Sequence, residues 1–397
     1  MRLIIIFFMS IIFIEAQSIE SLINYSLKKH YSLKGISYFL SSFDEKVEKS
    51  QLWDNPNGSI GINDIQFRKP FSRNEERMQN QTINFQQKLP WFGKINARKK
   101  VQEETRDVIL NSLEEAKVML AYNIRSTAYT IKELEARIRI VRKYALLEKQ
   151  NIELYTDSIS TDHMSHTNSI NAQLSLANIE IKIEKYITLL KSEKEKLNYL
   201  VQKRVNKIST RLTIKRPKPL RYYLSKLTQN PSYHKKISNT KKINAIKKVA
   251  DLEKYPDPFV KVGYYNRIDF PDYTSVSVGI SMPIYGKERL NSQIAQKAIL
   301  TAQSETIDYK EYLKSQIRIN YVKLNEAYRI YKIINNKSLP QVKHLLELSS
   351  SAIEEGADLF TYTNILEEKL SLEENKISMM GEYLRSEAKL KLLIGIK

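Results

Sequence analysis

The sequence of 397 residues contains no cysteine and few of the residues that turn a chain. The absence of cysteine excludes disulfide bonds, thiolate metal sites and a lipid anchor on an N-terminal cysteine. The ten glycines and eleven prolines are less than half of the share, about 12%, that these residues have in average proteins. Because so few turns are available, the secondary-structure elements are expected to be long.

The sequence also lacks the signatures of common enzymes. It has no glycine-rich nucleotide loop, no HExxH or GxSxG motif and no cysteine nucleophile, and its five histidines are scattered. We therefore predict a protein that is not an enzyme and that has no cofactor and no resident metal ion.

The first residues, "MRLIIIFFMSIIFIEAQS", have the layout of a secretory signal peptide. A basic residue precedes an apolar stretch from Leu3 to Ile14, and a small residue, Ala16, follows it. The stretch is too short to span a bilayer as a permanent anchor. We predict a signal peptide over residues 1–16 and export of the remainder, with a short buried N-terminal strand as the alternative.

The formal net charge is +20, and much of the excess lies in one segment. Between Lys203 and Lys248 the chain has fifteen Lys or Arg and no Asp or Glu. Such a segment is a solvated surface, a contact for an acidic protein or envelope polymer, or a nucleic-acid surface. The export signal argues against the last, so we expect no nucleic-acid partner.

Two very long helical runs dominate the pattern. The first, from about residue 95 to 159, has no glycine or proline and is on the order of 100 Å long at 1.5 Å per residue. Its apolar positions form two heptad rows typical of a coiled-coil seam. The rows are Leu113, Leu120, Thr127, Leu134 and Val141, and Ile124, Ile131, Ile138 and Ala145. The second run covers 287–355, with a kink expected at Pro340.

Each long run starts after a similar corner, "LPWFGK" or "MPIYGK", and ends near a similar tip. The stretch from Gly93 to Asn168 is nearly equal in length to the stretch from Gly286 to Asn364. These matched separations predict an internal repeat. The first repeat is 17–205, the second is 258–397, and a basic region, 206–257, separates them.

Proline cannot donate to a strand ladder and glycine permits a sharp change of direction. We therefore interpret the corner residues as joints between strand and helix: Pro90, Gly93, Pro283 and Gly286.

A pair of strands is predicted before each corner, over residues 58–90 and 258–285. In "TSVSVGISMP" the residues Val276, Val278 and Ile280 alternate with serines and a glycine. This pattern suits a membrane barrel strand and equally a half-buried strand of a soluble protein. If the strands cross a membrane, four cannot close a barrel, so several copies of the chain must share one.

The sequence resembles the TolC-type outer-membrane efflux proteins. The resemblance rests on the signal peptide, the two corners, "PDPFVKVGYYNR", "EEGADLFTYTNILEEKLSL" and "LRSEAKLKLLIG". It implies an α+β membrane protein: a homotrimeric twelve-stranded β-barrel, four strands per protomer, continuous with a long α-helical periplasmic tunnel. The hairpins 94–205 and 287–395 would form the tunnel, and the basic region would lie in an equatorial belt. The implied partners are a periplasmic adaptor, an inner-membrane transporter and outer-membrane lipid.

The resemblance also implies functional positions near the helical tips. Asn364 and Glu367 match the family's acidic pair at the pore gate, although Asn364 departs from it by lacking the charge. Positions implied for adaptor docking are Ser160, Asp162, Gly356 and Asp358. "DHMSH" (162–166) is either a surface turn or a copper or zinc site, and "LPWFGK" resembles the family's heavy-metal branch.

The function implied is a passive exit duct for efflux or type I secretion, gated at its periplasmic tip and located in the outer membrane. A soluble periplasmic coiled-coil adaptor or scaffold is the alternative, since it shares the long hairpins. The sequence does not identify the cargo.

Overall fold

The computed structural model describes residues 17–158, 163–354 and 359–397. The predicted signal peptide therefore lies outside the described residues, as do four predicted docking residues: Ser160, Asp162, Gly356 and Asp358. The chain forms two compact units made of discontinuous segments. Unit 1 comprises the described parts of Met1–Lys34, Glu114–Asn230 and Glu311–Lys397, and unit 2 comprises Gly35–Leu113 and Pro231–Lys310.

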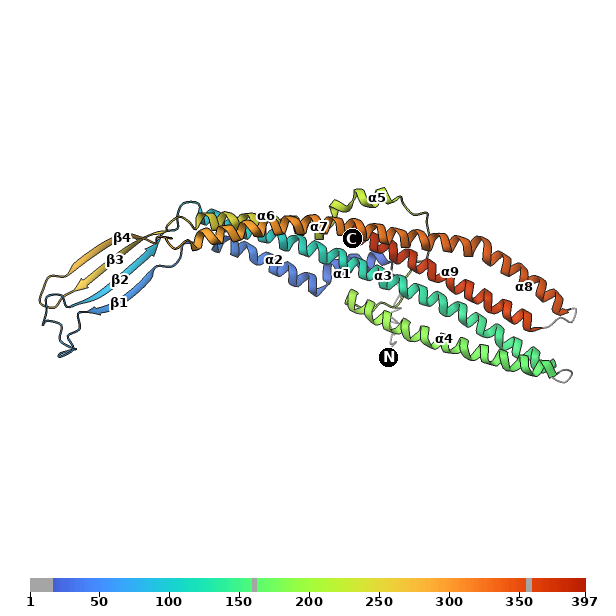
Figure 1. Cartoon of the computed structure of the whole chain (residues 1–397). Coiled ribbons are helices and arrows are strands. Elements are labelled where there is room, and N and C mark those ends of the chain that lie inside the picture. Colours follow the sequence, from blue (N-terminus) through green and yellow to red (C-terminus); the bar gives the residue numbers. More distant parts are fainter. Residues whose placement is uncertain (1–16, 159–162, 355–358) are drawn as a thin grey trace, which may run out of the picture. The chain divides into compact units, whose positions relative to one another are not determined.

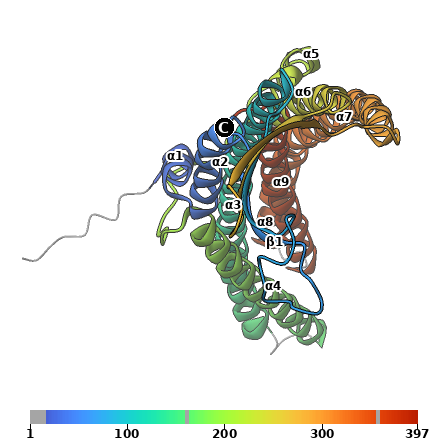
Figure 2. The ribbon, with the colours of Figure 1, turned by 90° about the vertical axis from the view of Figure 1, so that its left-hand side faces the viewer.

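Unit 2 contains an antiparallel four-stranded sheet of order β1-β2-β3-β4 (Figure 1). The strands are β1 (Asn57–Asn63), β2 (Asn80–Lys88), β3 (Pro258–Asn266) and β4 (Tyr273–Ile280). They lie where the alternating sequence pattern predicts strands, which confirms that prediction. Viewed from its end, the sheet is a curved band (Figure 2). Strand β2 pairs with β3 although the first helical hairpin and the basic region lie between them in the sequence, so the two predicted strand pairs form one sheet.

The helices of unit 2 continue from the sheet. They comprise most of α2 (Tyr31–Lys49), the first part of α3 (Lys94–Ser158), α6 (Pro231–Leu252) and the first part of α7 (Lys287–Ile333). Helix α6 packs along α7, where Lys236 Nζ lies 2.8 Å from Glu305 Oε2 and Ser292 Oγ donates to Asp251 at 2.7 Å.

Unit 1 is built from helices, and α3 supplies its central seam. The helices are α1 (Ile19–Lys29), the rest of α3, α4 (His163–Val201), the end of α7, α8 (Leu339–Glu354) and α9 (Leu359–Leu393). The predicted heptad positions of α3 are buried, including Thr127, and Ala145 is half-buried. The coiled-coil seam is therefore confirmed at the level of individual residues.

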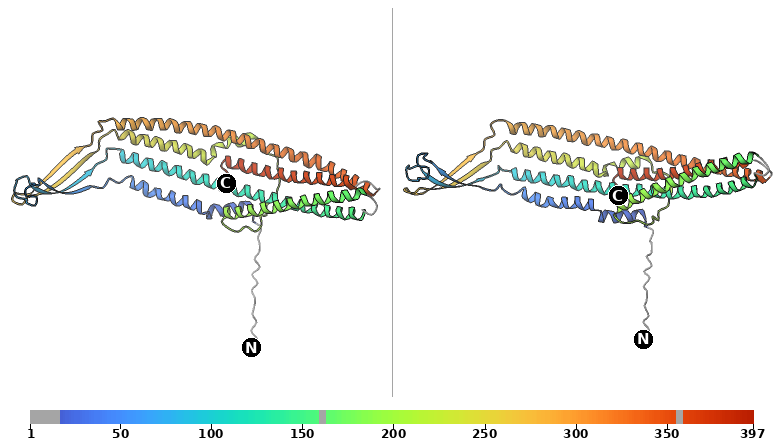
Figure 3. Two further views of the ribbon diagram at one scale, coloured as in Figure 1. Left: turned by 60° about the horizontal axis from the view of Figure 1, so that its bottom comes forward. Right: turned by 90° about the horizontal axis from the view of Figure 1, so that it is seen from below.

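Two helical hairpins of unit 1 pack against each other (Figure 3), α3 with α4 and α8 with α9. Their contact is a cluster of buried residues drawn from all four helices: Val141, Tyr144, Ile179, Leu346, Leu366 and Leu370. Burial of these side chains removes a large apolar area from water, which is the main favourable term in holding the hairpins together.

The second long helical run is interrupted close to the predicted kink. A π-helical turn, η2 (Ile334–Ser338), separates α7 from α8, and the N–H of Leu339 donates to the carbonyl of Ile334. Pro340 follows at the second position of α8. Proline lacks the N–H that an α-helix needs and crowds the preceding turn, and the widened turn accommodates it.

Helix α4 ends at Val201, shortly before the predicted end of the first hairpin at 205. Gln202 has a φ of 54°, so the helix cannot continue through it. An irregular stretch then leads to the short helix α5 (Leu220–Ser225) and the 3₁₀ turn η1 (Leu227–Gln229). None of the helices within the described ranges is both apolar and long enough to span a bilayer.

Candidate functional site

One face of the sheet in unit 2 is apolar and exposed. Strand pairing aligns Ile60 with Ile83 and Val262 with both Phe85 and Val276, so apolar side chains from all four strands share this face. Ile60 is 85% exposed and Val276 is 67% exposed. The exposed apolar residues of the face are Ile60, Ile62, Ile83, Phe85, Val262, Tyr264, Val276, Val278 and Ile280. An exposed apolar patch of this size indicates a face that contacts lipid or another protein.

The opposite face is polar and largely covered by its own side chains. Thr82 and Asn84 are buried, and the Asn84 amide donates to the Thr82 hydroxyl at 3.1 Å. Tyr265 stacks on Tyr273 of the neighbouring strand with 4.6 Å between ring centroids. Gly263 lies between Asn84 and Tyr265, where a Cβ atom would collide with both side chains. This arrangement of apolar and polar faces confirms the predicted alternation.

The two edges of the sheet are open among the described residues. Strand β1 pairs only with β2, and β4 pairs only with β3. Each edge strand therefore presents a row of backbone N–H and C=O groups without strand partners, which is costly in lipid.

The two joints between strand and helix have the same backbone design. Gly93 and Gly286 directly precede the first residues of α3 and α7, with φ values of 83° and 75°. The carbonyl of each glycine accepts the first hydrogen bond of its helix, from Ala97 and Leu290 respectively. A left-handed φ costs a residue with a Cβ about 1–2 kcal/mol, so glycine is favoured at both positions.

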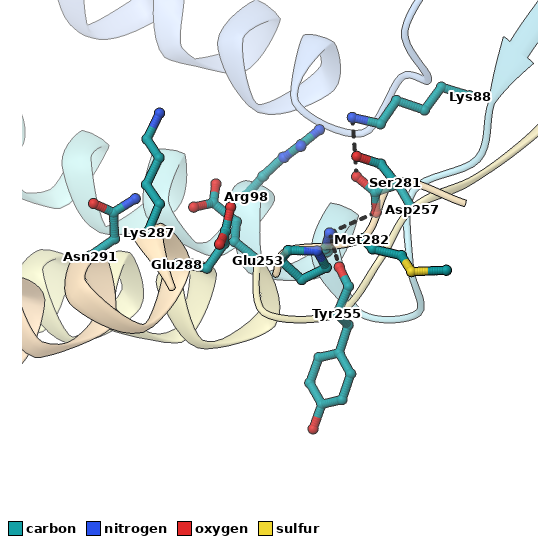
Figure 4. A pocket seen from close by; sticks show the side chains of 12 residues that line it. Lys88, Arg98, Glu253, Tyr255, Asp257, Ser281, Met282, Lys287, Glu288 and Asn291 are labelled. Carbon is teal, nitrogen blue, oxygen red and sulfur yellow. Dashed lines mark hydrogen bonds and ion pairs between the residues drawn. The ribbon is translucent and has the colours of Figure 1, made fainter. Parts of the chain in front are cut away.

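Asp257 ties the first joint to the start of β3 (Figure 4). Its carboxylate accepts from Lys94 Nζ at 2.6 Å and from the Trp91 N–H at 2.9 Å, and Lys88 Nζ lies 3.2 Å away. Burial by itself would raise the pKa of Asp257, but these bonds, that from Lys94 first, outweigh it and hold the pKa below its ordinary value. The carboxylate is therefore ionised and fully partnered.

A polar hollow of about 310 Å³ opens beside this carboxylate. Its lining includes Lys88, Lys94, Arg98, Glu253, Asp257 and Glu288. Sequence reasoning assigned no role to Asp257. Its only signal was the position between two prolines at the entry to a strand.

Near the tips of unit 1, Glu367 on α9 faces α4. Its carboxylate accepts from the Ser175 hydroxyl at 2.6 Å, and Asn364 lies exposed one turn earlier. Glu148 on α3, which sequence reasoning missed, is 3% exposed, and one of its carboxylate oxygens has no hydrogen-bond partner among the described residues. Burial, and secondarily the charge of Glu367, raise the pKa of Glu148.

Two charged groups connect the hairpins further along unit 1. Glu133 on α3 pairs with Arg137 on the same helix and with Arg385 on α9. Glu374 on α9 accepts from the Tyr186 hydroxyl on α4 at 2.6 Å, with Lys182 Nζ 3.3 Å away. These groups fix the register of the hairpins, because each carboxylate bonds two side chains.

The segment "DHMSH", considered above as a surface turn or a metal site, lies only partly within the described residues. Asp162 is outside the described residues, and His163 and His166 are in the first turn of α4, where the side chains are not described. In the part of the chain that the structure describes, no group of three or more His, Asp or Glu is arranged to hold a metal ion.

No protein-family model matches the sequence, and no curated protein is similar enough in sequence to match. Solved structures do match. The chain resembles the Campylobacter jejuni CmeC outer membrane channel with a TM-score of 0.79 and 12% identity, over 96% of this chain and 86% of that one. It resembles the outer membrane protein VceC of Vibrio cholerae with a TM-score of 0.78 and 14% identity, over 95% and 96% of the two chains.

A third similar structure is that of CusC, a protein that forms a transmembrane channel. The TM-score is 0.74 and the identity is 14%, over 96% of this chain and 93% of that one. At these identities the likeness concerns the fold. The resemblance inferred from the corners and tips is thus confirmed at that level, and the chain has the fold of the TolC-type outer-membrane channels.

Proposed function

We propose that the protein is the outer-membrane channel subunit of a tripartite efflux or type I secretion system. The observation that carries the proposal is the exposed apolar face of a four-stranded sheet with two open edges. In water this face would expose many large apolar side chains, whereas in a bilayer it would contact lipid. CmeC and VceC, whose structures are similar to that of this chain, are outer-membrane proteins, which supports the same location for this chain.

The open edges call for pairing with other copies of the chain, and the homotrimer that the resemblance implies would provide it. If β4 of one protomer pairs with β1 of the next, three sheets close a twelve-stranded barrel and every backbone group in lipid is bonded. Helix α7 supports this assembly because it is apolar on two sides: one side is buried within the chain and the other is exposed. The exposed residues fall on one face at 3.6 residues per turn. They are Leu290, Ile294, Leu300, Ile307, Ile319, Val322 and Ile333.

The helical hairpins would continue the barrel as a periplasmic tunnel, closed at its tip and opened on docking to an adaptor. The bond between Ser175 and Glu367 joins the two hairpins near that tip, so we place the gate there, with Asn364 beside it. The duct would be passive, with energy supplied by an inner-membrane transporter.

The membrane role is tested by placing a cation on each face of β4. Val276→Arg puts an arginine on the apolar face, at an expected cost of about 2–4 kcal/mol near the bilayer midplane. Ser275→Arg is the matched control, because it adds the same charge to the polar face of the adjacent position. We expect the control to remain a detergent-extracted trimer with conductance in planar bilayers and Val276→Arg to be lost from the membrane fraction.

Recovery of the wild-type protein in the soluble periplasm without detergent would reject the channel and favour the soluble adaptor. Equal behaviour of the two variants would reject the assignment of the faces.

A further inference from the structure

The stretch from residue 203 to 226 in unit 1, here called the basic belt, carries nine cations and no carboxylate. The cations are Lys203, Arg204, Lys207, Arg211, Lys215, Arg216, Lys218, Arg221 and Lys226. Four of them, Lys203, Lys207, Arg211 and Lys215, recur at every fourth position. Along extended backbone this spacing is at most about 14 Å.

Most cations of the basic belt are exposed, and none has an anionic partner among the described residues. Eight are exposed and Lys226 is half-buried. Among the described residues, none of the nine forms an ion pair with a carboxylate. Three of the lysines lie over aromatic rings instead: Lys203 over Tyr25, and Lys218 and Lys226 over Tyr222, at 5.3, 4.2 and 4.9 Å from the ring centroids. Within the described part of unit 1, the positive charge of the belt is therefore not offset by any ion pair.

The backbone of the basic belt is held in place although most of it is irregular. The Ile208 side chain is buried, and its carbonyl accepts from Lys132 Nζ at 3.1 Å. The carbonyl of Lys215 accepts from the buried Tyr383 hydroxyl at 2.7 Å. Tyr223 on α5 is buried as well. These buried side chains and bonded carbonyls attach the backbone of the belt to the rest of unit 1, whereas the cations are exposed to solvent. The cations are therefore held in defined positions on the surface.

The composition of the belt selects among anionic partners. The large apolar side chains between residues 203 and 226 are all buried or half-buried. Folded protein partners bind through surfaces whose centres are enriched in aromatic residues and depleted of lysine, and membrane-inserting surfaces need exposed apolar residues. The belt has neither feature. An extended ligand with repeating charges matches a row of cations better.

We propose that the basic belt binds a linear, carboxylate-bearing polysaccharide of the cell envelope. The choice of a glycan rests on the proposed function, which places unit 1 in the periplasm. Binding is electrostatic and releases counterions, so the affinity falls steeply with salt. The contact would tether the helical part of the protein to the envelope polymer without involving the sheet.

The test measures fluorescence polarisation of a labelled oligogalacturonate with the purified full-length protein over a range of NaCl concentrations. The belt variant is Arg211→Gln/Lys215→Gln/Arg216→Gln, whose side chains are exposed. The matched control is Lys143→Gln/Lys185→Gln/Lys191→Gln, which removes three exposed cations of unit 1 that have no ion pair among the described residues. Each lost contact is worth about two- to threefold, so three lost contacts should weaken binding by about 8- to 30-fold in the belt variant. The control should stay within twofold, and the salt dependence of the belt variant should be shallower.

Equal losses in the two variants would show that only net charge matters and would overturn the proposal. So would tighter binding of a labelled oligodeoxythymidylate or of polyglutamate than of the glycan, or no glycan binding at all. Conductance separates this inference from the proposed function. A belt variant that conducts normally but fails to bind supports the belt alone, whereas a wild-type protein that binds but never conducts removes only the channel.

Discussion

Lys94 and Asp257 are 163 positions apart in the sequence, yet Lys94 Nζ lies 2.6 Å from Asp257 Oδ1. The lysine is the first residue of α3 and the aspartate directly precedes β3, so the pair joins the first strand-to-helix joint to the second strand pair. The side chains of Lys94 and Asp257 are 6% and 9% exposed. The ion pair is therefore shielded from water, and removal of either charge would leave the other charge buried without its partner.

Replacing Asp257 with Asn should destabilise unit 2. The substitution leaves the buried Lys94 ammonium without a negatively charged partner, so only neutral oxygens, the new amide and the Tyr255 carbonyl 2.8 Å away, remain to accept from it. Leaving one member of a buried pair unmatched costs about 3–5 kcal/mol. The measurement is guanidinium-induced loss of helical circular dichroism in detergent. As a control, Glu75→Gln removes the exposed pair with Lys69 and should leave the midpoint unchanged; a similar midpoint for both variants would contradict the role of Asp257.

Alanine at Gly93 should destabilise the first joint, whereas alanine at Gly35 should not. Gly93 has a φ of 83°, where a Cβ costs about 1–2 kcal/mol. Gly35 lies inside α2, and a Cβ added there meets no atom within 4 Å. Gly35→Ala should therefore stabilise the helix by about 1 kcal/mol. Thermal unfolding midpoints of the two variants should move in opposite directions, and movement in the same direction would refute the argument.

Glu148 should make the protein less stable as the pH rises above the ordinary pKa of a glutamate. Its folded-state pKa is raised by burial, so between the unfolded and folded pKa values the folded state binds more protons. Stability is then full below the unfolded pKa and declines as the pH rises toward the folded one. Glu148→Gln should remove this decline: the variant should melt at a higher temperature at pH 8 and at the wild-type temperature at pH 4. Glu153→Gln, at an exposed position of the same helix, should have no effect at either pH.

Asp257 should act in the opposite direction. Because its folded-state pKa is lowered, its contribution is present above the unfolded pKa and is lost as the pH falls through the folded one. The Asp257→Asn variant should therefore differ most from wild type at neutral pH and least in acid. A difference that grows on acidification would contradict the ion pair.

Glu367→Gln should alter how the conductance of single channels depends on salt and on divalent cations. The amide oxygen can still accept from Ser175, so the bond between hairpins is kept while the charge is removed. Glu368→Gln removes the same charge from the next, exposed position and is the control. An unchanged conductance-versus-salt curve for Glu367→Gln would exclude Glu367 from the gate.

Much of the fold was predictable because its signals are local. Alternation of Val276, Val278 and Ile280 with small polar residues specified a strand with one apolar face, and the heptad rows of α3 identified its buried side. The sparse glycines marked Gly93 and Gly286 as joints, and their φ values are positive. In each case the side-chain period of a strand or helix converts sequence spacing directly into a shared face.

By itself, then, the sequence determined the type, length and buried side of most elements. The tertiary structure alone decided which distant groups meet: Asp257 with Lys94, Glu367 with Ser175, and the sheet pairing of β2 with β3. Where the sequence predicted a kink at Pro340, the structure has a π-helical turn just before this residue. The physical reason is that periodicity is a short-range property, whereas a contact between segments far apart in the sequence depends on the register at which complete elements pack.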